Sequence, residues 1–412
     1  NVKLTYNDGS DPESVIKKFE NGQYSFATVM PNSSTYKSVK KKFGDNIVYG
    51  VQYGTSYYLG FNIDRQKYNH TAKTTDAQKS STKQAILNKD FRQAVNFAFD
   101  REAYAAQANG KDGASKLIRN LYIPPTFVQA DGKTFGEMVK TELVTYGDEW
   151  KDANLDDGQN GLYNAKQAKE EFAKAKSALE ADGVKFPIHL DMPVDQTTPS
   201  KVQRAQSFKQ SVESSLGKDN VVVDIHMVSK EDLLNVTLFA AKAEDEDWDI
   251  SDNVGWSPDY QDPSTYLDIL KASSGENTRT FLGFDPSENN EAAKKVGLYD
   301  FEKMITEAGA ETKDLNKRFE KYAAAQAWLT DSALVIPTTS KTGRPFLTRV
   351  EPFSAPFGWT GGKGKDNVVY KGMELQDKAV TTEDYNKALE KWKKEQAESN
   401  QKAQEELKDH VK

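Results

Sequence analysis

Hydrophobic and polar positions alternate along the first part of the chain in a pattern of short strands around a helix. Residues 3–6 and 24–30 alternate at every second position, which is typical of half-buried strands. Between them, Asp11 is a suitable N-cap for a helix whose first residue is Pro12. An aromatic-rich strand region follows at residues 46–63. The pattern predicts a strand–helix–strand unit that leads into further strands.

Helical periodicity and strand-like runs then succeed one another along the middle of the chain. Apolar residues recur at helical spacing in four segments, residues 90–108, 164–182, 200–216 and 311–330. Short apolar runs predict strands at residues 186–190, 221–227, 248–250 and 334–337. Residues 121–163 begin with a Pro-Pro break, and they predict a long irregular region. The succession predicts a β–α–β unit over residues 186–227.

The last part of the chain, residues 381–412, predicts one long polar helix. Thr381 and Asp384 have the spacing of a capping box at its start. Tyr385 and Leu389 begin an apolar stripe that covers only the first half of the helix. A helix lying on a membrane surface would need a continuous apolar face and a basic bias, so a solvated helix is the favoured interpretation.

Composition limits the class of protein. A chain of 412 residues is too long for one compact core, so two or more domains are expected. Charged residues make up 28% of the chain, and no run approaches the ~18 apolar residues that cross a membrane. The net charge of −7 argues against nucleic-acid binding, which normally requires a basic surplus.

Several kinds of chemistry find no support in the sequence. The chain has no cysteine, which removes disulfides, thiolate metal sites and cysteine nucleophiles. The four histidines, His70, His189, His226 and His410, are far apart and form no zinc-binding pattern. The run Gly361–Gly364 lacks the spacing of a phosphate loop and predicts a flexible turn. Adjacent carboxylates lie on charged loops rather than in apolar pockets, so neither catalysis nor a metal or other cofactor is expected.

Residues 255–269, with the sequence GWSPDYQDPSTYLDI, concentrate aromatic rings and carboxylates in a turn-like segment. Asp259 lies between Trp256 and Tyr260 along the chain. A carboxylate between two large aromatic rings suits an ammonium group, because the ring faces and the carboxylate both favour a cation. A simple turn with aromatic cover over a core edge explains the same residues equally well from local chemistry.

Two motifs resemble those of oligopeptide-binding proteins of ABC importers, most closely the streptococcal Ali/Ami type. Residues 255–260, GWSPDY, continued by DPSTYL, resemble the signature of that family, and the helix FRQAVNFAFDR resembles a second hallmark. The resemblance implies that Asp259 receives the α-amino group of a bound peptide, with Trp256 in the adjacent wall. It also implies that Gly255, Ser257 and Tyr260 belong to this ligand segment, a name used here for residues 255–260.

The resemblance also implies an architecture. Family members are two-lobed α/β solute-binding proteins of the type II periplasmic-binding-protein class, with mixed sheets flanked by helices and a hinge. Residues 1–60 and 340–412 are expected to be parts of lobe I, and residues 61–339 are expected to form lobe II with the ligand segment. Family members open with a lipid-anchored cysteine, so an N-terminal portion that includes part of lobe I is expected to be missing from this chain.

The function implied by the resemblance is that of an extracellular receptor which captures extended peptides between two lobes and passes them to ABC permease subunits. Such a receptor is expected to be a monomer at the outer face of the cell membrane, held only by the lipid anchor. It is expected to be neither an enzyme nor a nucleic-acid-binding protein. The alternatives are a binding protein for a sugar or nickel, and a hydrolase that depends on carboxylates.

Three further residues are candidates for lining a ligand cleft near the hinge. Tyr57, Tyr58 and Thr339 fall in predicted strands, and ordinary sheet packing explains them at least as well. Some family members carry a basic residue just before the Gly-Trp pair, able to meet a peptide's C-terminal carboxylate. Here residues 251–254 are Ser-Asp-Asn-Val. A fixed clamp on the C-terminus is therefore not expected at this place.

Overall fold

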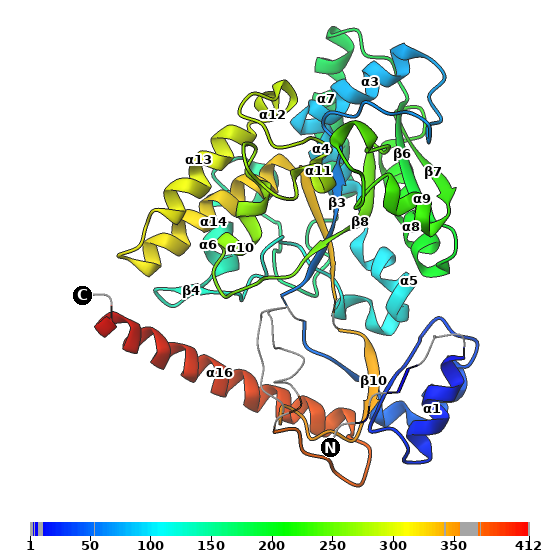
Figure 1. The fold of residues 1–412 in the computed structure, drawn as a ribbon, viewed down its shortest axis with the longest axis vertical. Coiled ribbons are helices and arrows are strands. Elements are labelled where there is room, and N and C mark those ends of the chain that lie inside the picture. Colours follow the sequence, from blue (N-terminus) through cyan, green and yellow to red (C-terminus); the bar gives the residue numbers. More distant parts are fainter. Residues whose placement is uncertain are drawn as a thin grey trace. The chain divides into compact units, whose positions relative to one another are not determined.

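The computed structural model describes residues 3, 5–6, 11–52, 54–341, 343–354, 370 and 372–410. The chain forms two compact units (Figure 1). Unit 1 contains residues 1–52 and 342–412, and unit 2 contains residues 53–341. The predicted turn at Gly361–Gly364 lies outside the described residues.

Unit 1 is built around a small antiparallel sheet. Its elements are α1 (Pro12–Glu20), β1 (Phe26–Thr28), α2 (Tyr36–Phe43), a 3₁₀ helix (Gly44–Asn46), β2 (Val48–Tyr49), β10 (Pro345–Thr348) and α16 (Thr382–His410). The strand order is β1-β10-β2, so a strand from late in the chain lies between two early ones. Phe19, Ala27 and Leu347 are fully or almost fully buried in the core of this unit.

The helix predicted near the start of unit 1 is confirmed, and the strand predicted after it is shorter than expected. Asp11 caps α1, since its carboxylate accepts hydrogen bonds from two backbone N–H groups of the first turn. The strand predicted for residues 24–30 forms only at Phe26–Thr28. Residue 4, in the strand predicted at residues 3–6, lies outside the described part of the chain.

The long C-terminal helix is confirmed as α16. The Thr381 hydroxyl accepts a hydrogen bond from the Asp384 N–H at 3.0 Å, as the capping pattern predicts. Early in the helix, Trp392 stacks on Phe353 with ring centroids 5.0 Å apart. The later half carries exposed ion pairs four residues apart, and such pairs stabilise a helix by only a few tenths of a kcal/mol each, about 0.3–0.5. Among the described residues, no helix is long and apolar enough to cross a membrane.

Unit 2 contains most of the described helices and five longer strands. Its helices are α3 (Asp76–Leu87), α4 (Lys89–Ala98), α5 (Arg101–Gly113), α6 (Phe135–Leu143), α7 (Ala165–Ala181), α8 (Pro199–Leu216), α9 (Lys230–Asn235), α10 (Ser264–Leu267), α11 (Thr278–Leu282), α12 (Glu291–Lys295), α13 (Leu298–Gly309) and α14 (Leu315–Ser332). Short 3₁₀ helices occur at Ala114–Lys116, Asp148–Trp150, Ala243–Asp245 and Asp268–Leu270. Its strands are β3 (Ser56–Phe61), β4 (Gln129–Ala130), β5 (Lys133–Thr134), β6 (Ile188–Asp195), β7 (Val221–Val228), β8 (Ile250–Trp256) and β9 (Val335–Ser340).

The strands of unit 2 form two sheets that matter for the site, besides the short β4-β5 pair. In the first, β3 lies between β8 and β9, and both pairings are antiparallel. In the second, β6 and β7 are parallel and are connected through α8 (Figure 1). Parallel strands need a crossover connection, which the helix provides. The predicted β–α–β unit over residues 186–227 and the α/β class are therefore confirmed.

The predicted helix at residues 90–108 is wrong as a single helix. It divides into α4 and α5, because the backbone is extended at Phe99 and at Asp100. Asp100 caps α5 by accepting hydrogen bonds from the N–H groups of Glu102 and Ala103. The capping side chain lies inside a continuous apolar pattern, and it marks the boundary between two helices. Periodicity by itself does not show such a boundary.

The irregular region predicted for residues 121–163 is also corrected. It contains the β4-β5 pair and helix α6. Thr134 and Glu137 form a capping box at the start of α6, with the Thr134 N–H donating to the Glu137 carboxylate at 2.7 Å. This Thr-x-x-Glu pattern was visible in the sequence and is the signal that predicts the helix.

Candidate functional site

The ligand segment begins where β8 ends, and its first residue lies opposite Tyr57 of β3. In the register of these strands Gly255 pairs with Tyr57. A β-carbon at Gly255 would lie 2.5 Å from Cδ1 of the Tyr57 ring, so the ring occupies the space that a side chain would need. Glycine at this position therefore allows the Tyr57 ring to approach β8 closely.

Trp256 and Ser257 follow directly and lie partly exposed. The Trp256 Nε1–H is buried and has no hydrogen-bond partner within the described parts of the chain. A buried donor without a partner costs about 1–3 kcal/mol. The Ser257 hydroxyl is 2.6 Å from that of Thr55, just before β3. The two strand ends are thus tied together beside Trp256.

The loop after β8, residues 257–263, is fixed from several sides. Arg318 of α14 donates two hydrogen bonds to the Asp262 carboxylate, at 2.8 and 3.0 Å. The Asp259 N–H donates to the Thr265 hydroxyl at 3.0 Å. Gln261 donates to the carbonyl of Phe127 at 3.1 Å. These contacts set the backbone of the loop and leave its outward side chains free to meet a ligand.

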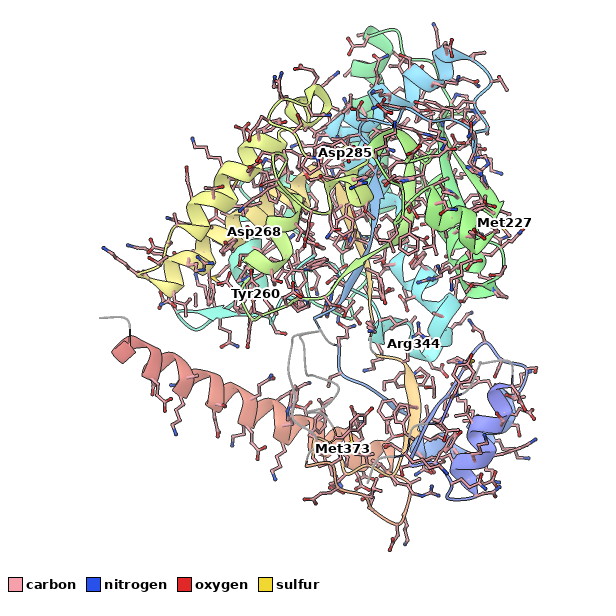
Figure 2. The ribbon with its side chains drawn as sticks, in the orientation of Figure 1. Met227, Tyr260, Asp268, Asp285, Arg344 and Met373 are labelled. Carbon is pink, nitrogen blue, oxygen red and sulfur yellow. The ribbon has the colours of Figure 1, made fainter. Side chains whose placement is uncertain are left out.

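Asp259 differs from Asp262 in its partners. The Asp259 side chain is exposed, and none of the described residues donates a hydrogen bond to its carboxylate or forms an ion pair with it. Its neighbour Tyr260 is 50% exposed and lies at the margin of unit 2 in Figure 2. The Tyr260 hydroxyl is 3.2 Å from that of Ser264. An unpaired carboxylate beside exposed aromatic surface can bind a cation such as an ammonium group.

Tyr58 and Thr339, the other cleft candidates, are buried in unit 2. The Tyr58 ring is fully buried and packs edge-on against Tyr122 and Phe281. Thr339 is 3% exposed and pairs with Tyr57 on one side and Ile118 on the other. Their place is in the sheet and core, and the structure brings only Tyr57 together with the ligand segment.

Sequence reasoning missed a group of polar residues beside β8. The Tyr104 hydroxyl of α5 donates to the Asp252 carboxylate of β8 at 3.1 Å. Arg204 of α8 lies over the Tyr104 ring, 5.3 Å from its centroid. Tyr104 together with Asp252 and Tyr57 raises the pKa of Arg204 above its usual value, against the opposing effect of burial. No sequence motif marks Arg204, because its neighbours come from three distant elements.

Metal chemistry finds no support in the site geometry. Within the described ranges, no group of three or more His, Asp or Glu side chains is arranged to hold a metal ion. The site instead offers a free carboxylate, aromatic surface and an unpaired indole N–H. This combination suits an organic ligand that carries an amino group and hydrogen-bond acceptors.

Curated relatives match the whole chain. The oligopeptide-binding protein SarA of Streptococcus gordonii is 66% identical over 411 residues, and the oligopeptide-binding protein AliA of Streptococcus pneumoniae is 62% identical over 412 residues. Both alignments cover 100% of this chain and 62% of the relative. The chain therefore spans less than two thirds of the length of these relatives.

Solved structures share the fold. Listeria monocytogenes OppA bound to peptide has a TM-score of 0.54 at 21% identity, covering 89% of this chain and 57% of that one. An oligopeptide ABC transporter substrate-binding domain from Bacillus anthracis has a TM-score of 0.54 at 20% identity, covering 83% of this chain and 54% of that one. The family model described as bacterial extracellular solute-binding proteins, family 5 Middle, matches residues 2–278. The family is one of binding proteins rather than enzymes, and this chain belongs to it.

Proposed function

We propose that the protein containing this chain binds oligopeptides outside the cell and delivers them to an ABC importer. The support is membership of the solute-binding family and the similarity to SarA and AliA, both named as oligopeptide-binding proteins. The partners of such a receptor are oligopeptides and the permease subunits of the importer. A lipid anchor preceding this chain would hold a monomeric receptor at the outer face of the membrane.

Asp259 is the proposed receptor for the amino terminus of the peptide. The observation that carries this assignment is that its carboxylate is exposed and unpaired among the described residues, whereas the carboxylate of Asp262 is held by Arg318. Trp256 contributes its partly exposed ring and its unpaired Nε1–H. Tyr57 and Tyr260 supply further aromatic surface near the ammonium group.

The two compact units are proposed to be parts of the two lobes that close on the peptide. The resemblance gives lobe I residues 1–60 and 340–412 and lobe II residues 61–339, whereas the compact units divide after residues 52 and 341. An extended peptide can be held through its backbone as in an added strand, while roomy hydrated pockets accept different side chains. The ammonium contact at Asp259 fixes the register of the peptide, and the remaining contacts tolerate many sequences.

The experiment is peptide binding by calorimetry with Asp259→Asn. Asparagine keeps the shape of the side chain and removes its charge. A buried ammonium–carboxylate pair that loses one partner costs roughly 3–5 kcal/mol, so tight binding of a free-amine peptide is expected to be lost. Thermal unfolding is expected to be unchanged, because none of the described residues depends on this carboxylate.

Asp76→Asn is the matched control, since the Asp76 side chain is 98% exposed at the start of α3. This control is expected to bind as the unchanged protein does. Acetylating the peptide's amino group should reproduce the loss seen with Asp259→Asn. Equal affinity of Asp259→Asn and the unchanged protein for a free-amine peptide would refute the assignment of Asp259. Absence of any peptide binding by the unchanged protein would refute the proposed function for this chain.

A further inference from the structure

Arg119 is a completely buried cation of unit 2 whose orientation is fixed by one carboxylate. Asp157 accepts two hydrogen bonds from it, from Nε at 3.2 Å and from Nη2 at 2.9 Å. Such a bidentate pair sets the plane and the direction of the guanidinium. The loop that carries Asp157 is also attached through its backbone, since the Gly158 N–H donates to the carbonyl of Ile118 at 3.0 Å. The guanidinium is therefore held in a single orientation.

The third nitrogen of Arg119 is directed at the start of β3. Its Nη1 group donates to the Ser56 hydroxyl at 3.0 Å. It also lies 3.3 Å from the carbonyl oxygen of Thr55 and 3.4 Å from that of Gly54. The Gly54 carbonyl accepts a further hydrogen bond from the hydroxyl of Tyr266. The position of this strand end thus depends on the position of the guanidinium.

The same strand end contacts the ligand segment directly. Ser56 pairs with Trp256 in the register of β3 and β8. The Thr55 hydroxyl is 2.6 Å from that of Ser257. Printed contacts therefore run from the Arg119 guanidinium to the start of β3, and from there to two residues of the ligand segment.

We propose that Arg119, oriented by Asp157, is a positioning residue for the ligand segment, and this inference rests on the proposed peptide-binding function. The guanidinium fixes the start of β3, and the contacts of β3 fix Trp256 and Ser257. A binding site needs such support behind it, because a small displacement of a binding group weakens its contacts. Loss of the guanidinium is expected to displace Trp256 and to weaken peptide binding while every group of the ligand segment remains present.

The first test measures the affinity for a free-amine, alanine-rich pentapeptide by calorimetry in the unchanged chain and in Arg119→Met. Methionine is unbranched and flexible, so it fills much of the space of the arginine without its donors. The Asp157 side chain is 21% exposed, so water can solvate the carboxylate that is left behind. The affinity is expected to fall by about 10- to 100-fold, as for the loss of a hydrogen bond to a charged group.

Two conservative variants test whether the geometry of the guanidinium, rather than its charge, positions the strand. Arg119→Lys keeps the charge but lacks the planar fork that reaches Asp157 and Ser56 together. Asp157→Asn keeps an oxygen acceptor and removes the negative charge. Both variants are expected to bind the peptide with affinities between those of the unchanged chain and Arg119→Met. Arg119→Lys also tests the inference should Arg119→Met fail to fold.

A spectroscopic measurement separates positioning from a general loss of stability. The indole N–H resonances of the tryptophans are recorded by NMR without peptide, and Trp256→Phe identifies the resonance of Trp256. Arg119→Met is expected to shift this resonance and to leave those of Trp248 and Trp328 in place. A variant that only destabilises the fold has no reason to move one indole resonance alone.

Arg279→Met is the matched control, because Arg279 also joins a carboxylate to a backbone carbonyl within unit 2. Its Nε is 3.1 Å from a carboxylate oxygen of Asp285, and its Nη1 donates to the carbonyl of Ala240 at 2.9 Å. The control removes interactions of the same kind away from the start of β3. It is expected to keep both the peptide affinity and the position of the Trp256 resonance.

The outcomes separate this inference from the function on which it rests. An unmoved Trp256 resonance in Arg119→Met would overturn the inference. Where the unchanged chain binds the peptide, an undiminished affinity of Arg119→Met, or an equal weakening by Arg279→Met, would overturn it as well. If the unchanged chain bound no peptide, the proposed function of this chain would fall. The Trp256 resonance would then still decide whether Arg119 positions the ligand segment.

Discussion

Two charged regions of unit 2, one at each end of β8, differ in whether their charged side chains are paired. Before the strand, Asp247 and Asp249 join Asp191 of β6 around Arg65 and Lys73 in a buried cluster. After the strand, the exposed carboxylate of Asp259 has no partner within the described ranges, and beside the strand the guanidinium of Arg204 has none. One strand therefore connects a saturated cluster, in which the charged side chains are paired with one another, with an unsaturated region, in which they have no such partner.

The saturation of the buried cluster is visible at Asp191. Its carboxylate accepts hydrogen bonds from Arg65 at 2.7 Å, from Lys73 at 2.5 Å and from His226 at 2.7 Å. Burial raises the pKa of Asp191, but the hydrogen bond from His226 and the charges of Lys73 and Arg65 outweigh it and hold the pKa well below its usual range. Charges paired in this way position β6 against the start of β8.

This difference indicates which charged side chains are candidates for ligand binding in a chain with 62 acidic and 55 basic residues. Sequence counts show a surface of mixed charge, and many of these groups form ordinary ion pairs, such as Lys83 with Asp64. A charge that the fold leaves without a partner, next to aromatic surface, can bind a group of opposite charge. Asp259 meets this description, and four substitutions test the comparison.

The largest expected effect comes from breaking the saturated cluster with Asp191→Ala. The variant leaves Arg65 and Lys73 buried with fewer carboxylates, and breaking such a pair costs roughly 3–5 kcal/mol. Urea unfolding should show a free energy of unfolding lower by that amount. Asp219→Ala, at an exposed position between α8 and β7, is the control and should change the value little. A loss below about 1 kcal/mol would show that the cluster does not hold the fold together.

Glu246 offers a second test, because it is buried next to the cluster without joining it. Its Oε2 accepts a hydrogen bond from the Trp248 Nε1–H, and its Oε1 has no partner among the described residues. Burial raises the pKa of Glu246 to about 8. Between about pH 4.5 and about pH 8 the unfolded chain has released this proton and the folded chain retains it. Rising pH therefore lowers the free energy of unfolding, by up to about 1.4 kcal/mol per pH unit from this group.

The measurement is urea unfolding of Glu246→Gln and the unchanged protein at about pH 5.5 and about pH 7.5. The glutamine variant lacks the ionisable group, so its advantage in stability should grow as the pH rises. A difference between the two proteins that does not change with pH would show that Glu246 is ionised in the folded state.

Gly255→Ala sharpens the comparison at the unsaturated end of β8. The new methyl group would lie 2.5 Å from the Tyr57 ring and 3.2 Å from the carbonyl oxygen of Ser56. The ring must move, which is expected to cost about 1–3 kcal/mol of stability and to weaken peptide binding. Gly44→Ala is the matched control, since nothing lies within 4 Å of its β-carbon position. Equal affinity in calorimetry for Gly255→Ala and the unchanged protein would show that the Tyr57 ring takes no part in the site.

The smallest effect is expected at Asp262, the paired carboxylate of the loop. Burial raises the pKa of Asp262, but hydrogen bonds from Arg318 and Ser264 outweigh it and lower the pKa. Asp262→Asn should lower the free energy of unfolding by about 1 kcal/mol, because this pair is partly exposed to solvent. Asp259→Asn should leave the thermal midpoint unchanged and affect binding only. A destabilisation by Asp259→Asn equal to that of Asp262→Asn would remove the distinction between the two carboxylates.

Local patterns predicted many of the elements. The β–α–β unit at residues 186–227, the polar helix at α16 and the cap at Asp11 follow from periodicity and capping, which depend on neighbours a few residues away. The same reasoning failed at Asp100, where a cap interrupts an apolar run, and at α6, whose capping box at Thr134 was overlooked. The first error concerned where one helix ends and the next begins, and the second left out a whole helix.

The sequence by itself determined the family resemblance, the α/β class and the ligand segment with Asp259 and Trp256 as candidates. These conclusions rest on residues that are adjacent in the chain. Only the tertiary structure decided which charges remain unpaired. Arg318 reaches Asp262 from α14 and leaves Asp259 free, while α5, α8 and β8 place Arg204 without a partner. The pairing of charges depends on distances between distant segments, and those distances exist only once the chain has folded.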